Sequence, residues 1–123
     1  MIGIGSDLLD IRRIEKTISR FGDRFKNKIF TKNEINKCEK RLNKFECYAK
    51  RFAAKEAVMK SLGKGWRQLS WKDIEISGGG KPEVILYGKA KELASELNIE
   101  NVHVSLSHEE DKAIAFTISE IEE

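Results

Sequence analysis

The spacing of hydrophobic residues changes along the chain, from every second position to every third or fourth, and this separates predicted strands from predicted helices. Residues 2–8 have period-two spacing, which predicts a short strand with Ile2 and Ile4 on one face. Gly3, Gly5 and Asp7 fall on the other face. Two glycines on one face allow another segment to pack close to the backbone, and Asp7 stands at the end of the predicted strand.

Helical spacing or helix-start residues mark five further segments. They cover residues 8–21, residues 25–30, a segment that begins after Thr31, residues 44–62 and residues 89–97. Asp10 is placed to cap the first turn of the first helix, and Gly22 ends that helix. Thr31 and Glu34 form a capping box, and Gly63 ends the longest helix.

Four more strands are predicted in the second half of the chain, where turn residues separate short apolar runs. They cover residues 71–76, 83–87, 102–106 and 113–118. The glycine-rich turn 78–82 joins the first two, and the charged stretch 108–112 joins the last two as a hairpin. This order of elements predicts an α+β fold, in which a small antiparallel β-sheet packs against the long central helix.

The composition is that of a globular protein, with 123 residues, 40% hydrophobic, 35% charged and a single proline. This length predicts a single domain over residues 1–123. No apolar run approaches the roughly 20 residues of a membrane-spanning helix, and the N-terminal segment lacks the features of a signal peptide. We therefore predict a cytoplasmic protein without membrane contact, whose Cys38 and Cys47 are reduced thiols.

Charge is distributed unevenly, although the net charge is only +3. Residues 1–65 contain 17 Lys and Arg against 8 Asp and Glu, whereas residues 66–123 contain 6 against 12. A basic half indicates an anionic partner, such as a nucleic acid, an acidic protein or a phosphorylated small molecule, or else a solvated helical surface. A nucleic-acid-binding module is disfavoured, because the aromatic residues of this half fit helix cores and no nucleic-acid-binding motif is visible.

Glu56 is the most unusual residue of the longest predicted helix. The apolar stripe of this helix includes Tyr48, Phe52 and Met59, and position 56 lies within the stripe. A carboxylate on a packing face needs a cation or a proton, because burying an unpaired charge is costly. A pair with Lys60, one helical turn later, explains the position equally well from spacing alone.

Other candidate residues also have structural alternatives. Asp7 is either a ligand or a cap for the helix that follows it. His108 lies in the predicted hairpin turn, where an exposed histidine needs no function. Lys81 and the glycines before it can cradle a phosphate, but a strand follows them, whereas a helix follows the glycine-rich loop of a Walker motif.

Four motifs, in order along the chain, resemble those of one family. Residues 3–7 resemble its G-I-G-x-D motif, and residues 51–63 resemble its R-F-A-A-K-E-A-x-x-K-x-x-G motif. Residues 80–82 and 104–108 resemble its G-K-P turn and its V-S-[IL]-[ST]-H strand. The family is that of the holo-[acyl-carrier-protein] synthases, the small bacterial type of 4′-phosphopantetheinyl transferase. The resemblance spans essentially the whole chain and implies the 4′-phosphopantetheinyl transferase fold.

The resemblance implies a reaction and roles for three residues. Coenzyme A would donate 4′-phosphopantetheine to a serine of apo acyl carrier protein, leaving adenosine 3′,5′-bisphosphate and supporting fatty acid biosynthesis. The carboxylates of Asp7 and Glu56 would bind Mg²⁺, which takes oxygen ligands. Asp7, Glu56 or a metal-bound water would accept the serine proton. Lys60 would protonate or stabilise the leaving phosphate.

The resemblance also implies binding surfaces for two substrates. The candidates for contacts with coenzyme A are Arg51, Lys81, Pro82 and His108. Acyl carrier proteins are acidic, and the family docks them on its first helix. The expected contacts with the carrier are Arg13 and Arg24, with Arg20 as a further candidate.

The family assembles as homotrimers, with each active site between neighbouring subunits. A trimer would place Gly3 and Gly5 beside a partner surface and would bury more apolar area for a small chain. Two segments depart from the family pattern, the highly charged stretch 109–112 and the three consecutive glycines at 78–80. Both departures bear on the coenzyme A pocket and on the role expected for His108.

Overall fold

The structure is a computed structural model that describes residues 2–65, 67–78 and 80–121. In chain order, the elements are β1 (Ile2–Asp10), α1 (Ile11–Phe21), α2 (Asp23–Ile29), α3 (Lys32–Glu39), α4 (Lys44–Leu62), a short 3₁₀ helix η1 (Trp71–Asp73), β2 (Ile74–Ser77), β3 (Glu83–Leu86), α5 (Gly88–Glu96), β4 (Ile99–Glu109) and β5 (Lys112–Ile121). The strand pairs are antiparallel, and the predicted α+β fold is confirmed.

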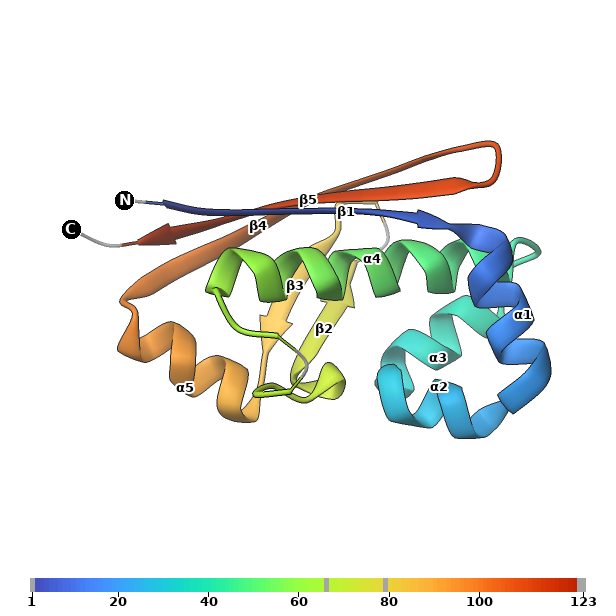
Figure 1. Cartoon of the computed structure of the whole chain (residues 1–123), viewed down its shortest axis with the longest axis horizontal. Helices are drawn as coiled ribbons and strands as arrows, with labels where there is room; N and C mark the ends of the chain where they lie inside the picture. The colour runs from blue at the N-terminus through green and yellow to red at the C-terminus, as the bar shows by residue number, and fades with distance from the viewer. Residues whose placement is uncertain (1, 66, 79, 122–123) are drawn as a thin grey trace.

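The strands of the described segments form two sheets, whereas a single sheet was expected. β1, β5 and β4 lie in that order in a three-stranded sheet, and β2 pairs with β3 as a separate hairpin. Figure 1 shows α4 lying along one face of the three-stranded sheet, with α2, α3 and α5 beyond it and the hairpin of β2 and β3 running past it. The long helix is therefore enclosed between two layers, which explains why most of its residues are buried.

Small residues let β1 and β5 approach α4 closely. Ala113 of β5 is fully buried. A Cβ added at Gly3 would lie 2.2 Å from the Ser61 carbonyl oxygen, and one added at Gly5 would lie 1.9 Å from the Ala57 carbonyl oxygen. The prediction that these glycines admit a closely packed segment is confirmed. That segment is α4 of the same chain, so their expected position beside a partner surface is wrong.

Gly5→Ala is expected to lower the free energy of unfolding by about 3 kcal/mol, because a methyl group has no room between β1 and the backbone of α4. Gly65→Ala is the matched control, since the nearest atom to its added Cβ is 4.0 Å away. Urea denaturation of both variants measures the difference. Equal stability of the two variants would contradict the close packing of β1 on α4.

Local sequence signals predict most helix ends correctly. The Asp10 side chain caps α1 by accepting a hydrogen bond from the backbone of its first turn. Thr31 and Glu34 form the complete capping box of α3. Gly63 follows α4 with a left-handed φ of 78°. The expected helix start at Leu8 is wrong, because β1 pairs with β5 as far as Asp10.

Three expectations for later segments need correction or cannot be assessed. The 3₁₀ helix η1 replaces the first part of the strand that was predicted over residues 71–76. His108 lies in β4, because the pairing of β4 with β5 continues through Glu109 and Lys112 and leaves a turn of only two residues. Gly79 of the predicted glycine-rich turn lies outside the described residues.

Cys38 of α3 and Cys47 of α4 form a disulfide, so the expectation of two reduced thiols is wrong. Their Cα atoms lie 5.4 Å apart, within the usual range for a disulfide. Two cysteines in a chain of this class give no sequence signal for pairing. The packing of α3 against the first turn of α4 brings the two sulfur atoms together.

A buried ion pair joins three elements of the core. Lys55 of α4 and Glu34 of α3 are both fully buried, and their charged groups lie 2.7 Å apart. Lys55 also donates hydrogen bonds to the carbonyl oxygens of Trp71 and Ile74, and Glu34 accepts one from the Ile76 backbone N–H. The pair therefore fixes α3 and β2 to α4.

Lys55→Met is expected to lower the free energy of unfolding by about 3–5 kcal/mol, because Glu34 would remain buried without its cation. The double variant Lys55→Met/Glu34→Gln is expected to recover part of this loss, since a neutral amide oxygen can still accept the Ile76 hydrogen bond. Urea denaturation gives both values. A double variant that is no more stable than Lys55→Met would show that the unpaired charge is not the cause.

Candidate active site

Asp7, Glu56 and Lys60 come together where β1 passes along the C-terminal half of α4. Lys60 Nζ lies 3.4 Å from Asp7 Oδ1 and donates a hydrogen bond of 2.9 Å to the Ser6 carbonyl oxygen. Asp7 faces α4 because it shares a strand face with Gly5, which contacts that helix. The ion pair of Lys60 is with Asp7, and none with Glu56 is present in the described part of the chain.

Burial raises the pKa of both carboxyl groups in this cluster. For Asp7, the nearby Lys60 ammonium opposes the effect of burial on the pKa. For Glu56, the negative charge of Asp7 raises the pKa further, and the charges of Lys60 and Arg13 lower it. The effect of Asp7 on the pKa of Glu56 requires the two carboxylates to lie near each other. Lys60 is the nearest cation, but its side chain is 53% exposed, so solvent screens its charge.

Of the basic residues expected to bind the carrier protein, Arg13 lies nearest the carboxylates. The charge of Arg13 on α1 lowers the pKa of both Asp7 and Glu56, which places α1 beside the carboxylates. Arg20 and Arg24 are exposed further along α1 and α2. The Arg20 guanidinium lies 5.2 Å from the ring centre of Phe21, which is 48% exposed. Phe21 was not predicted as a surface residue, because an aromatic residue at a helix end usually belongs to the core.

A cavity of about 320 Å³ adjoins the carboxylate cluster. It is lined by Glu56, Met59, Lys60, Gly63, Lys64 and Gly65. Glycines at the end of α4 keep this side of the helix free of bulky side chains. A phosphate-bearing ligand therefore has room next to Glu56 and Lys60.

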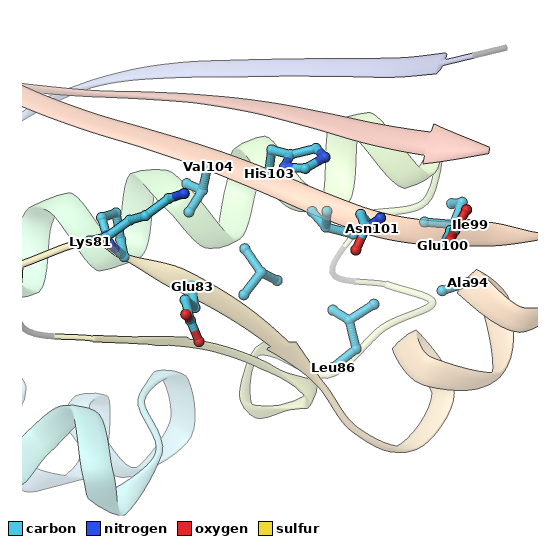
Figure 2. Close-up of a pocket in the computed structure, with 12 residues that line it drawn as sticks. Lys81, Glu83, Leu86, Ala94, Ile99, Glu100, Asn101, His103 and Val104 are labelled. Atoms are coloured by element: carbon cyan, nitrogen blue, oxygen red, sulfur yellow. The ribbon is translucent and has the colours of Figure 1, made fainter. Parts of the chain in front are cut away.

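Two of the residues expected to contact coenzyme A lie at the other edge of the three-stranded sheet. Lys81 and Pro82 line a cavity of about 450 Å³ between β3 and β4. Figure 2 shows Lys81 and Glu83 toward one end of this cavity and Ala94 of α5 toward the other. Because β5 lies between β1 and β4, this cavity and Asp7 belong to opposite edges of the three-stranded sheet.

The two remaining candidates lie at the N-terminal half of α4, since Arg51 belongs to this helix and His108 of β4 contacts it. His108 Nε2 lies 3.4 Å from Glu46 Oε2, and His108 Nδ1 lies 3.4 Å from Lys50 Nζ. Arg51 is only 5% exposed, and its Nη1 lies 3.1 Å from Cys47 Sγ. Within the described residues, the buried Nε of Arg51 has no hydrogen-bond partner. One chain therefore joins Asp7, Glu56 and Lys60 in a site but leaves the other candidates dispersed.

Comparison with known proteins identifies the family of this chain. The sequence model described as the 4′-phosphopantetheinyl transferase superfamily matches residues 3–117. The chain belongs to this superfamily. The matched range includes both carboxylates and each of the other candidate residues, from Asp7 to His108.

Curated relatives narrow the assignment within the phosphopantetheinyl transferases. The holo-[acyl-carrier-protein] synthase of Halothermothrix orenii is 43% identical to the chain, over 96% of this chain and 96% of that protein. The synthase of Solibacter usitatus is 42% identical, over 98% of each. The solved synthase of Neisseria meningitidis has a TM-score of 0.88 at 38% identity, covering 98% of this chain and 99% of that one.

The solved synthase of Helicobacter pylori, in complex with coenzyme A, has a TM-score of 0.82 at 35% identity, covering 98% of this chain and 100% of that one. The chain is similar to these synthases over nearly its whole length, in both sequence and fold. It is therefore an enzyme of the holo-[acyl-carrier-protein] synthase type.

Proposed function

We propose that this enzyme transfers 4′-phosphopantetheine from coenzyme A to a serine hydroxyl of an apo acyl carrier protein, with Mg²⁺ held by Asp7 and Glu56. The observation that carries the proposal is the pair of half-buried carboxylates beside Lys60. The names of the relatives and the coenzyme A complex of the Helicobacter pylori synthase support the choice of substrates. The reaction would supply holo acyl carrier protein for fatty acid biosynthesis.

The residues present suit Mg²⁺ as the metal. The described segments contain no group of three or more His, Cys, Asp or Glu residues that could enclose a metal ion. Mg²⁺ does not require such a cage, because it is usually held by one or two carboxylates, several waters and substrate phosphates. A cation between Asp7 and Glu56 would remove the repulsion that raises the pKa of Glu56. When bound, it would offset negative charge on the transferred phosphate and on the leaving group.

The protein side chains supply proton transfer and further charge stabilisation. Asp7, Glu56 or a metal-bound water would accept the serine proton, since both carboxylates lie at the site where the hydroxyl would attack. The Lys60 ammonium has three N–H donors, of which the Ser6 carbonyl and Asp7 take two. The third can face the leaving phosphate beside the adjoining cavity.

We propose that the carrier protein docks on the basic surface formed by Arg13, Arg20 and Arg24. All three side chains are exposed, and together they cover α1 and the start of α2. Arg13 also acts on the pKa of both carboxylates, so a carrier bound there would hold its serine near the metal site. Such exposed charges chiefly raise the rate of encounter with an acidic partner, and salt weakens their effect.

We also propose a homotrimer in which each active site lies between two subunits. The outer face of the three-stranded sheet is apolar, with Ile4, Leu8, Phe116 and Ile118 exposed by 65%, 65%, 53% and 42%. A contiguous apolar face of this kind is typical of a protein–protein interface. A second subunit would also bring the Lys81 cavity of one chain to the Asp7 cluster of another, which a single chain keeps apart.

No helix in the described part of the chain is both long and apolar enough to cross a membrane. The cytoplasmic location stays a prediction.

The test of the transferase is the appearance of adenosine 3′,5′-bisphosphate, followed by chromatography in the presence of coenzyme A, Mg²⁺ and apo carrier protein. The product is expected to accumulate until the apo carrier is consumed, and to be absent when holo carrier replaces it. Folded enzyme that releases no product from intact coenzyme A and apo carrier would overturn the proposal.

As the pH is lowered, Mg²⁺ affinity is expected to decline at a higher pH than it would for exposed carboxylates, whose pKa values are about 4. Burial raises the pKa of Asp7 and Glu56, so protons compete with the cation as the pH falls toward these raised values. Asp7→Asn removes the charge that raises the pKa of Glu56, so its weaker remaining binding is expected to persist to lower pH. Calorimetric Mg²⁺ titrations across this pH range measure both midpoints, and a wild-type midpoint at the ordinary carboxylate pKa would contradict the assignment.

A further inference from the structure

We propose that Cys38 and Cys47 form a redox-active pair that exchanges with anionic low-molecular-weight thiols through a basic pocket at Cys47. This proposal does not depend on the transferase reaction. The disulfide joins α3 to the first turn of α4, and both residues are buried. Exchange therefore requires a path from solvent to one of the two sulfur atoms.

A cavity of about 340 Å³ provides this path. It is lined by Arg41, Leu42, Asn43, Glu46 and Cys47, which belong to the connection between α3 and α4 and to the first turn of α4. Cys38 is not among these lining residues, so the cavity leads to one side of the disulfide only. Cys47 is therefore the sulfur that a small thiol can attack.

Positive charge surrounds Cys47. Arg51 Nη1 lies 3.1 Å from Cys47 Sγ, and the exposed Arg41 lines the cavity. The pKa of Lys37 is lowered by burial and further by the charges of Arg51 and Arg41, which places Lys37 near both arginines. A cation beside a cysteine stabilises the thiolate, which is the reactive form in thiol–disulfide exchange. The same charges favour a thiol reagent that is itself an anion.

Glu46 is the acidic residue that lines this cavity, and its charge is largely engaged. Its Oε1 lies 3.5 Å from Lys50 Nζ, and its Oε2 lies 3.4 Å from His108 Nε2. The cavity therefore keeps a positive balance from Arg41 and Arg51. This balance selects anionic thiols such as glutathione or coenzyme A over neutral ones.

The exchange proceeds in two balanced steps. The thiolate of the reagent attacks Cys47 Sγ, the bond between the two protein sulfur atoms breaks, and Cys38 leaves as a thiolate that takes up a proton. A second reagent thiolate then attacks the reagent sulfur of the mixed disulfide, which releases Cys47 as a thiolate held by Arg51. Two reagent thiolates are oxidised to their disulfide, and the protein disulfide gains two electrons and one proton, which Cys38 takes up, while Cys47 stays a thiolate beside Arg51. The reverse sequence, with the low-molecular-weight disulfide as oxidant, restores the bond.

The test compares reduction rates of the oxidised protein by glutathione, coenzyme A and neutral 2-mercaptoethanol, with the new thiols alkylated and counted by mass spectrometry. Arg41→Glu is expected to lower the rate with glutathione about fivefold relative to the rate with 2-mercaptoethanol, the effect of reversing one charge near the reacting sulfur. Lys89→Glu, the same charge change at an exposed residue of α5, is expected to leave this ratio unchanged. A higher rate with coenzyme A than with glutathione would identify the chain's own candidate substrate as the reagent, and the opposite order would identify a glutathione-type thiol.

Two results would overturn the proposal. One is a glutathione-to-mercaptoethanol ratio that is the same in Arg41→Glu and in wild type. The other is a pair of cysteines that stays fully alkylatable after treatment with oxidised glutathione. Single-cysteine variants test the site of attack independently: Cys38→Ser, which retains Cys47, is expected to form the mixed disulfide faster than Cys47→Ser does. The reverse order would show that the cavity at Cys47 is not the path.

Discussion

Glu56→Gln is expected to lower kcat by about 10³-fold or more, because the amide keeps the size of the side chain but loses the charge that holds the cation. The Mg²⁺ affinity is expected to fall with it. The stability of the metal-free protein should not fall, since burial and the charge of Asp7 already disfavour ionisation of Glu56 in the fold. Initial rates at saturating substrates, calorimetric Mg²⁺ titration and urea denaturation measure the three quantities.

Arg24→Glu is the control for this experiment, because Arg24 is exposed on α2 and belongs to the proposed docking surface. This variant is expected to raise KM for the carrier protein and to leave Mg²⁺ affinity unchanged. Arg13→Glu is less suitable, since Arg13 also acts on the pKa of both carboxylates. Near-normal turnover of Glu56→Gln, with wild-type Mg²⁺ dependence, would remove Glu56 from the metal site.

Mixing two inactive variants is expected to restore activity if the active site is shared between subunits. One variant carries Glu56→Gln, and the other carries Lys81→Glu together with His108→Ala. After unfolding and refolding in equal amounts, random trimers would contain about a quarter of their sites with both contributing sides intact. The rise from nearly none to about a quarter of wild-type activity, measured as carrier modification, is the expected result.

The unmixed variants, refolded separately, are the controls for this experiment. Both are expected to remain inactive and to have the oligomeric mass of the wild type by light scattering. Trimers of mixed composition without recovered activity would show that one chain supplies all of these residues to its own site. A monomeric wild-type protein would contradict the trimer itself.

Local patterns predicted the elements of the fold well where one physical rule dominates. The capping box of Thr31 and Glu34, the end of α4 at Gly63 and the close approach at Gly5 are each decided by a few neighbouring atoms. The position of His108 was not predictable in this way, because the charged stretch around it resembles a loop. Pairing of β4 with β5 extends the strand to Glu109.

Long-range contacts were the part that the sequence did not predict. The ion pair of Lys55 and Glu34 and the disulfide of Cys38 and Cys47 both depend on how α3 packs on α4. In each case the residues belong to different elements, and their spacing along the chain carries no periodic signal. Charged residues on a helix are usually solvated, so nothing in the neighbouring sequence indicates that Lys55 is fully buried.

The candidate site divides in the same way. On local grounds Asp7 and Glu56 each have a structural alternative, and only the family motifs assign both to one metal site. The structure adds the physical link, since the charge of Asp7 raises the pKa of Glu56 and Lys60 contacts Asp7. The candidates for contacts with coenzyme A are dispersed over one chain, and motif positions alone do not say how they would come together.

The mass of the carrier protein shows whether 4′-phosphopantetheine has been transferred to it. Wild-type enzyme with coenzyme A, Mg²⁺ and apo acyl carrier protein is expected to add about 340 Da to the carrier, at a serine located by fragmentation. Chelation of Mg²⁺, or the Glu56→Gln substitution, is expected to leave the carrier at its apo mass over the same time. A folded wild-type enzyme that leaves the carrier mass unchanged would contradict the transfer reaction. An addition that continues at full rate after chelation would contradict the role of Mg²⁺.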